Sequence, residues 1–133
     1  MKGVRTAGRL IVATLCAGFL AGTAYVAQLG VFGIVTSGLA GALFAVLAFT
    51  VAGPAFMIGA TLIGPLVWLA VRKTRLNHPF AAILIGAGVT IFAGALLFLG
   101  WGGWPGLWLI LAFPLAGGVG GWVFQRLMAG PAT

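Results

Sequence analysis

The chain has 133 residues, of which 62% are hydrophobic and 5% charged, and its seven charged side chains are all Lys or Arg. A soluble domain normally has about a quarter of its residues charged, with both signs present, so this composition excludes a domain folded in water and indicates one folded in lipid. Without Asp or Glu, acid–base or nucleophilic chemistry would rest on one His and one Cys with no orienting carboxylate. We therefore predict that the protein is not an enzyme.

The first apolar tract, Leu10–Leu29, follows the basic residues Lys2, Arg5 and Arg9. This order resembles a secretory signal, but about 20 apolar residues exceed the usual core of a signal and match the length of a membrane span. We therefore expect a retained first span at about residues 10–29. Cys16 lies inside it and is expected to be a small buried residue.

The second tract, Val31–Val71, ends at the basic segment Arg72-Lys73-Thr74-Arg75. A helix over residues 36–71 is roughly 54 Å long, against about 30 Å for the hydrocarbon core of a bilayer. The tract either crosses twice, with a turn at Gly53-Pro54, or crosses once at about residues 52–71, with an extra apolar helical segment at about 34–51 on the outer side. One crossing gathers all seven cations on one side, in line with the positive-inside rule, so we predict the second arrangement.

Small residues recur in this tract at a three-four spacing, which places them along one face of a helix. They are Gly38, Gly41, Ala45, Ala48, Ala52, Ala55 and Gly59. Small residues let helix backbones approach closely in lipid, so we predict a helix-packing stripe. The stripe passes Pro54, which predicts a long or kinked but continuous helix.

The remaining tracts predict spans at about residues 80–99 and 107–127, the first of them opened by Asn77-His78-Pro79, which is typical of a helix start. Small residues at helical spacing also mark the other three spans. They are Gly18 and Gly22 in the first span, Ala82 and Gly86 in the third, and Ala112, Ala116, Gly117, Gly120 and Gly121 in the fourth. The sequence thus predicts one all-α domain over residues 1–133, an integral membrane bundle of four transmembrane helices.

Candidate ligand-binding residues are few. His78 is the one histidine, and it is either a ligand for a haem or chlorophyll-type pigment or an interfacial residue at a helix start. A lone histidine lacks the second ligand that a metal site needs, so we predict no metal and no cofactor.

The tryptophans fall near the ends of the predicted spans, as in an aromatic belt that anchors helices at both interfaces. They are Trp68, Trp101, Trp104, Trp108 and Trp122. The three around the turn between the third and fourth spans also allow a platform for a sugar or a lipid.

The basic residues at the ends of the second and fourth spans set topology and offer contacts to anionic lipid headgroups. They are Arg72, Lys73, Arg75 and Arg126. Because the cations lie at the edges of apolar tracts and do not form a folded basic face, we expect no nucleic-acid partner. The expected location is the bacterial inner (cytoplasmic) membrane, multi-pass, with both termini cytoplasmic.

Two classes of function remain. The first is an accessory or structural subunit that packs its helices against other membrane proteins or copies of itself, with membrane lipids around it. The second is a small oligomeric channel or carrier. Ionisable residues deep in the membrane usually mark transport pathways, and their absence from the predicted spans favours the first class.

Overall fold

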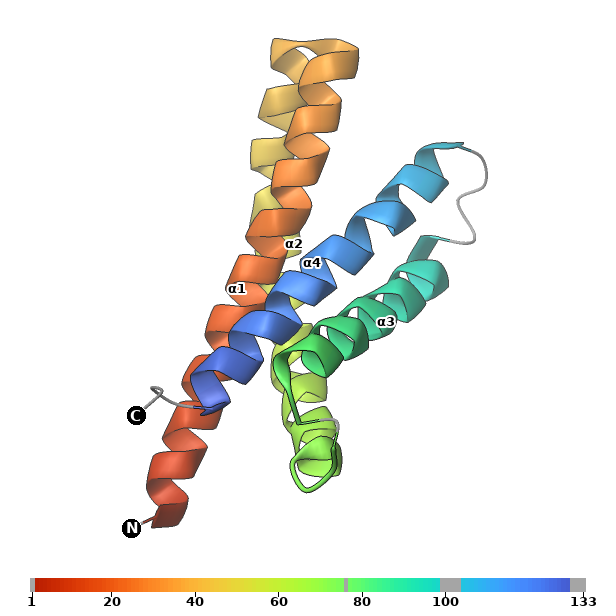
Figure 1. The fold of residues 1–133 in the computed structure, drawn as a ribbon. Helices are drawn as coiled ribbons and strands as arrows, with labels where there is room; N and C mark the ends of the chain where they lie inside the picture. Colours follow the sequence, from red (N-terminus) through yellow and green to blue (C-terminus); the bar gives the residue numbers. More distant parts are fainter. Residues whose placement is uncertain (1, 76, 99–103, 130–133) are drawn as a thin grey trace.

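Four α-helices make up the fold. The computed structural model describes residues 2–75, 77–98 and 104–129. The helices are α1 (Lys2–Ser37), α2 (Leu39–Val71), α3 (Pro79–Phe98) and α4 (Trp104–Ala129). They form two antiparallel hairpins, α1 with α2 and α3 with α4, and the hairpins cross through contacts of α1 with α4 (Figure 1).

The predicted all-α class is confirmed, with no strand in the described part of the chain. Three stretches are long and apolar enough to cross a membrane: Gly3–Ser37, Leu39–Val71 and Pro79–Leu96. A membrane protein is therefore the interpretation that length and composition support. The fourth crossing, by α4, stays a prediction.

The turn between α1 and α2 lies at Gly38. Its φ is 59° and its ψ is −135°, a conformation that side-chain-bearing residues rarely adopt. Gly38 N–H donates to the carbonyl of Ile34 at 3.0 Å, and the Gly38 carbonyl accepts from Gly41 N–H at 3.1 Å. One residue thus ends one helix and begins the next.

This turn differs from the expected boundary. The sequence predicts a first span at about residues 10–29, but α1 continues to Ser37. The extra apolar stretch at 34–51 is not a separate helix, because it is shared between the end of α1 and the start of α2. The physical reason is that the Gln28 amide has carbonyl partners at Ala24 and Ala112, so the helix continues through the following residues until Gly38 permits the reversal.

Proline does not interrupt the second helix. α2 contains Pro54 and Pro65 within one helix of 33 residues, continuous as predicted. α4 likewise contains Pro114. Proline removes one backbone hydrogen bond, which membrane helices tolerate where neighbours satisfy the freed carbonyl.

Aromatic rings join the two hairpins at the crossing point. Tyr25 of α1 lies 4.7 Å from Phe113 of α4 and 5.4 Å from Phe56 of α2, measured between ring centroids. Phe56 and Phe113 stack at 5.6 Å. Tyr25 and Phe113 are buried, and Ala116, which is fully buried, packs with them. This cluster fixes α1, α2 and α4 relative to one another.

Cys16 lies on the face of α1 that is turned away from the other helices. It is exposed, so the expectation of burial is wrong. Its neighbours Ala13, Thr14 and Ala17 are buried, and the helical repeat turns Cys16 to the opposite face.

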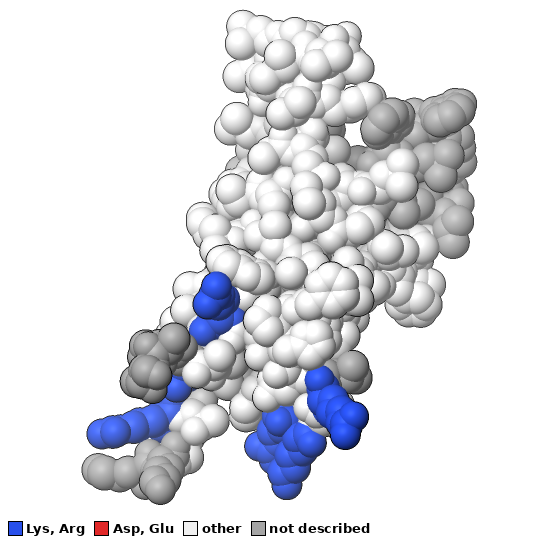
Figure 2. All heavy atoms as spheres, in the orientation of Figure 1, with Lys and Arg blue, Asp and Glu red and all other residues white. Residues whose placement is uncertain are grey.

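Lys and Arg side chains gather at one end of the molecule (Figure 2). At this end Arg9 of α1 donates to the carbonyl of Leu127, near the end of α4, at 2.9 Å. The start of α1 and the end of α4 therefore lie together.

Candidate functional site

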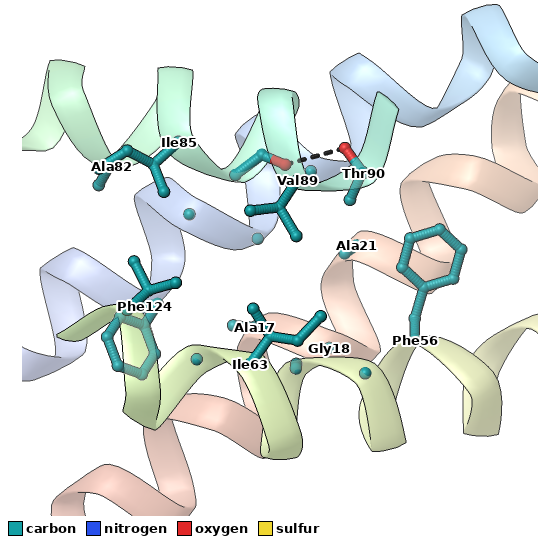
Figure 3. A pocket seen from close by; sticks show the side chains of 18 of the residues that line it. Ala17, Gly18, Ala21, Phe56, Ile63, Ala82, Ile85, Val89, Thr90 and Phe124 are labelled. Carbon is teal, nitrogen blue, oxygen red and sulfur yellow. Dashed lines mark hydrogen bonds between the residues drawn. The ribbon is translucent and has the colours of Figure 1, made fainter. Parts of the chain in front are cut away.

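A hollow of about 420 Å³ lies between α2 and α3, with α1 and α4 behind it. Figure 3 shows Ile85 and Val89 of α3 on one side of this space, and Phe56 and Ile63 of α2 on the other. The extensive packing is between α1 and α2, α3 and α4, and α1 and α4. The two crossed hairpins therefore leave α2 and α3 apart, and we call the space between them the interhelical groove.

Small residues from α1 and α4 line the back of the groove, together with larger ones such as Tyr25 and Phe124. Ala17 and Ala21 are buried there, and a Cβ on Gly120 would lie 3.1 Å from the Cβ of Ala21. Because these side chains are short, α1 and α4 approach closely and leave a smooth apolar wall. The groove owes its depth to this pair of helices.

Glycine-mediated contacts hold the α3–α4 hairpin together. A Cβ on Gly86 would meet the carbonyl oxygen of Gly117, and a Cβ on Gly121 would meet the carbonyl oxygen of Ala82. Backbone atoms cannot move aside as a flexible side chain does. Of the small residues that the sequence marks in the third and fourth spans, Ala82, Gly86, Gly117 and Gly121 lie at this contact.

The α1–α2 hairpin uses part of the predicted stripe in the same way. Gly41 and Ala45 are buried, and a Cβ on Gly41 would meet the carbonyl group of Gly33. From α1, a Cβ on Gly18 would lie 2.6 Å from the Cα of Met57, and one on Gly22 would lie 3.2 Å from the Cα of Gly53.

The other members of the stripe have different surroundings. Ala48 and Ala52 are half-buried, and Gly38 forms the turn. Ala55 is exposed and Gly59 has nothing within 4 Å of an added Cβ, and both line the groove. The stripe is therefore a contact with α1 in its first half and a groove wall in its second.

Two polar side chains connect helices inside the apolar region. Gln28 of α1 donates from Nε2 to the carbonyl of Ala112 on α4 at 3.0 Å. The Thr90 hydroxyl of α3 lies 2.9 Å from the carbonyl oxygen of Phe113 on α4 and 2.8 Å from that of Gly86 on its own helix. Polar groups in lipid are stabilised by such partners.

A second hollow adjoins the groove at the cationic end. It is lined by Trp68, Arg72, Lys73, Asn77, Gln125, Met128 and Ala129. Gln125 donates to the Asn77 side-chain oxygen at 3.1 Å, and Asn77 donates to the Arg72 carbonyl at 3.2 Å. We call this the basic mouth, because Arg72 and Lys73 are the charged residues in its wall.

Trp68 and Gln125 line both the groove and the basic mouth. The guanidinium of Arg72 lies over the Trp68 ring, 5.2 Å from its centroid, a favourable cation–π geometry. Apolar and basic surfaces therefore meet at one indole. Arg75 and Arg126 are exposed at the same end but do not line either hollow.

His78 caps a helix. Its Nδ1 accepts a hydrogen bond from the backbone N–H of Ala81 at 3.3 Å, and its carbonyl accepts from Ala82 N–H at 3.1 Å. The side chain is exposed. The described residues contain no group of three or more His, Cys, Asp or Glu that could hold a metal ion.

The tryptophans divide between the described and undescribed parts of the chain. Trp68 and Trp122 lie near the cationic end, where Arg126 stacks on Trp122 at 5.4 Å. Trp101 lies outside the described residues. Trp104 and Trp108 belong to the first turns of α4, where the side chains are also outside what the structure describes.

Sequence reasoning did not find the interhelical groove or the roles of Gln28 and Thr90. A glutamine inside an apolar helix is itself a signal, since an amide in lipid seeks a partner, but its partner carbonyl carries no sequence mark. Comparison of the chain with protein-family models, with curated proteins and with solved structures finds no match.

Proposed function

We propose that the chain is a non-enzymatic, multi-pass membrane protein that acts as an accessory subunit by packing against another membrane protein. The supporting observation is the projecting end of the α1–α2 hairpin, residues 31–51, which we call the hairpin tip. It extends past the neighbouring ends of α3 and α4 (Figure 1). Apart from Phe49, which is half-buried, its large apolar side chains are exposed, from 42% for Phe32 to 79% for Val35.

The length of the hairpin indicates why this tip needs a partner. From Leu10 to Ser37, α1 is roughly 42 Å long, whereas the hydrocarbon core is about 30 Å thick. The length of α3 matches this thickness. If α1 stands perpendicular to the membrane, about 12 Å of the apolar hairpin projects beyond the hydrocarbon core. A large apolar patch exposed to water is unfavourable and typically marks an interaction site.

Charge favours a different protein over a second copy. Each chain carries seven Lys and Arg and no Asp or Glu, and the described cations lie at one end (Figure 2). Two parallel copies would bring like charges together without a side-chain carboxylate to offset them. A partner with acidic residues near the membrane surface complements this end. In the proposed orientation, the cationic end and both termini lie on the cytoplasmic side of a bacterial inner membrane.

A site-specific photocrosslinker tests the proposal. Phe44 in the hairpin tip and Phe92 on α3 are both 67% exposed and aromatic, so they form a matched pair. With p-benzoylphenylalanine at each position in native membranes, we expect a discrete protein adduct from position 44 and none from 92. The same lipid-only pattern at both positions would contradict the proposal, and an adduct of twice the chain mass would show a homodimer instead.

Reconstitution separates association from transport. The groove wall is apolar apart from the polar atoms of Tyr25, Trp68, Thr90 and Gln125. The hydroxyl of Thr90 and the amide of Gln125 have partners within the protein. We expect liposomes that contain the purified protein alone to show no ion flux above empty vesicles. Selective flux from this preparation would favour the small channel or carrier.

A further inference from the structure

We propose that the interhelical groove and the basic mouth together bind one anionic phospholipid, with an acyl chain in the groove and the phosphate at Arg72 and Lys73. This inference rests on the shape and chemistry of the two adjoining hollows. It does not depend on the partner of the hairpin tip.

The groove suits hydrocarbon. Its volume of about 420 Å³ falls in the range of about 300–1,000 Å³ typical of small-molecule sites. Its wall runs along α2 from Val51 to Val71 and faces Ala82 to Thr90 of α3. An empty apolar space of this size loses dispersion contacts along its whole lining, and in a membrane the nearest material to fill it is an acyl chain.

The basic mouth suits a phosphate. Arg72 and Lys73 line it, and no side chain in the sequence can neutralise them because Asp and Glu are absent. No side chain of this protein can therefore supply the counter-ion of Arg72 and Lys73. Basic pockets between membrane helices on the cytoplasmic side bind anionic headgroups.

The two hollows lie in the order in which a phospholipid presents its parts. Trp68 and Gln125 belong to both, so the apolar space leads directly to the cations. Arg72 stacks on Trp68 at the boundary, which holds its guanidinium beside the mouth. The Gln125–Asn77–Arg72 hydrogen bonds fix α4 and the α2–α3 connection around it. A free phosphate would use the mouth alone, whereas a lipid uses both spaces.

Native mass spectrometry of the purified protein in mild detergent tests the site with two probes. These are phosphatidylglycerol and phosphatidylcholine with identical acyl chains. Each cation near the headgroup is worth roughly fivefold in affinity, so we expect about a twenty-fivefold preference for phosphatidylglycerol. Replacing both cations, Arg72→Gln with Lys73→Gln, should abolish the preference. Arg5→Gln removes an exposed cation that lines neither hollow, and it should leave the preference unchanged.

The acyl-chain part is tested by filling the groove. Gly59 lines it, and an added Cβ there meets nothing within 4 Å, so Gly59→Leu should occupy the space without moving the backbone. Gly88 on α3 is equally open but lies outside the groove, so Gly88→Leu is the matched control. We expect Gly59→Leu to lower phosphatidylglycerol retention at least tenfold and Gly88→Leu to leave it unchanged.

Thermal unfolding of each variant confirms that it is folded. If Gly59→Leu is unstable, Ala55→Leu replaces it, because Ala55 is exposed and lines the same groove. Equal retention by the groove-filling variant and the Gly88 control would overturn the proposal, as would equal binding of the two lipids by the unaltered protein. Loss of lipid in the cation variant alone, with groove filling without effect, would reduce the site to surface attraction and also overturn it.

Discussion

At Gly38 the backbone reverses in one residue with φ at 59° and ψ at −135°. A Cβ at this position meets no neighbouring atom, so the cost of a side chain there comes from the backbone conformation alone. We expect Gly38→Ala to destabilise the protein by about 1–3 kcal/mol, the usual cost of holding a side-chain-bearing residue in such a region. Thermal unfolding in detergent measures it.

Ser37→Ala is the matched control, because Ser37 is exposed, helical and adjacent to the turn. It should change stability by no more than about 0.5 kcal/mol, as surface substitutions usually do. Equal effects of the two changes would show that the turn does not depend on the conformation of Gly38.

Between helices, the α3–α4 hairpin depends on particular glycines. An added Cβ on Gly86 meets the carbonyl oxygen of Gly117, whereas one on Gly88, two residues later on α3, meets nothing within 4 Å. We expect Gly86→Ala to destabilise the protein by about 1–3 kcal/mol through overpacking. Gly88→Ala should be neutral or stabilising by up to about 1 kcal/mol, because alanine favours helix over glycine. Thermal unfolding that finds both variants equal would contradict a close backbone contact.

Hydropathy and small-residue spacing predict the helices but not their pairing into a groove. The four apolar tracts can be predicted from the sequence, because lipid requires long helical runs. The helix start at His78 can be predicted because Asn77-His78-Pro79 is typical of such a start. The turn at Gly38 cannot, since Gly38 is one of 23 glycines, and the polar residues before it, Thr36 and Ser37, are hydroxyl residues, a kind that also occurs inside helices in this chain. The stripe through Gly41 and Gly59 is visible, yet its division into a contact and a groove wall depends on how the two hairpins cross.

The molecule as a whole places its cations at one end and its apolar hairpin tip at the other (Figures 1 and 2). This asymmetry favours the proposed orientation, because the positive-inside rule places cationic segments on the cytoplasmic side. We predict that the α1–α2 hairpin crosses out and back, and that α3 and α4 do the same. In the predicted topology, Ser37 at the tip and Thr74 after α2 fall on opposite sides of the membrane.

Cysteine labelling with a membrane-impermeant reagent tests this topology. The exposed Cys16 is first replaced, Cys16→Ala, to remove background labelling. In that chain we expect Ser37→Cys to react from outside intact cells, and Thr74→Cys to react after the membrane is opened. Gly103→Cys, which lies outside the described residues, should react like Ser37→Cys if α3 and α4 both cross. Labelling of Ser37→Cys and Thr74→Cys from the same side would mean that the α1–α2 hairpin does not span the bilayer. The hairpin tip would then lie within the membrane or on its cytoplasmic side, and the argument for an outer partner would fail with it.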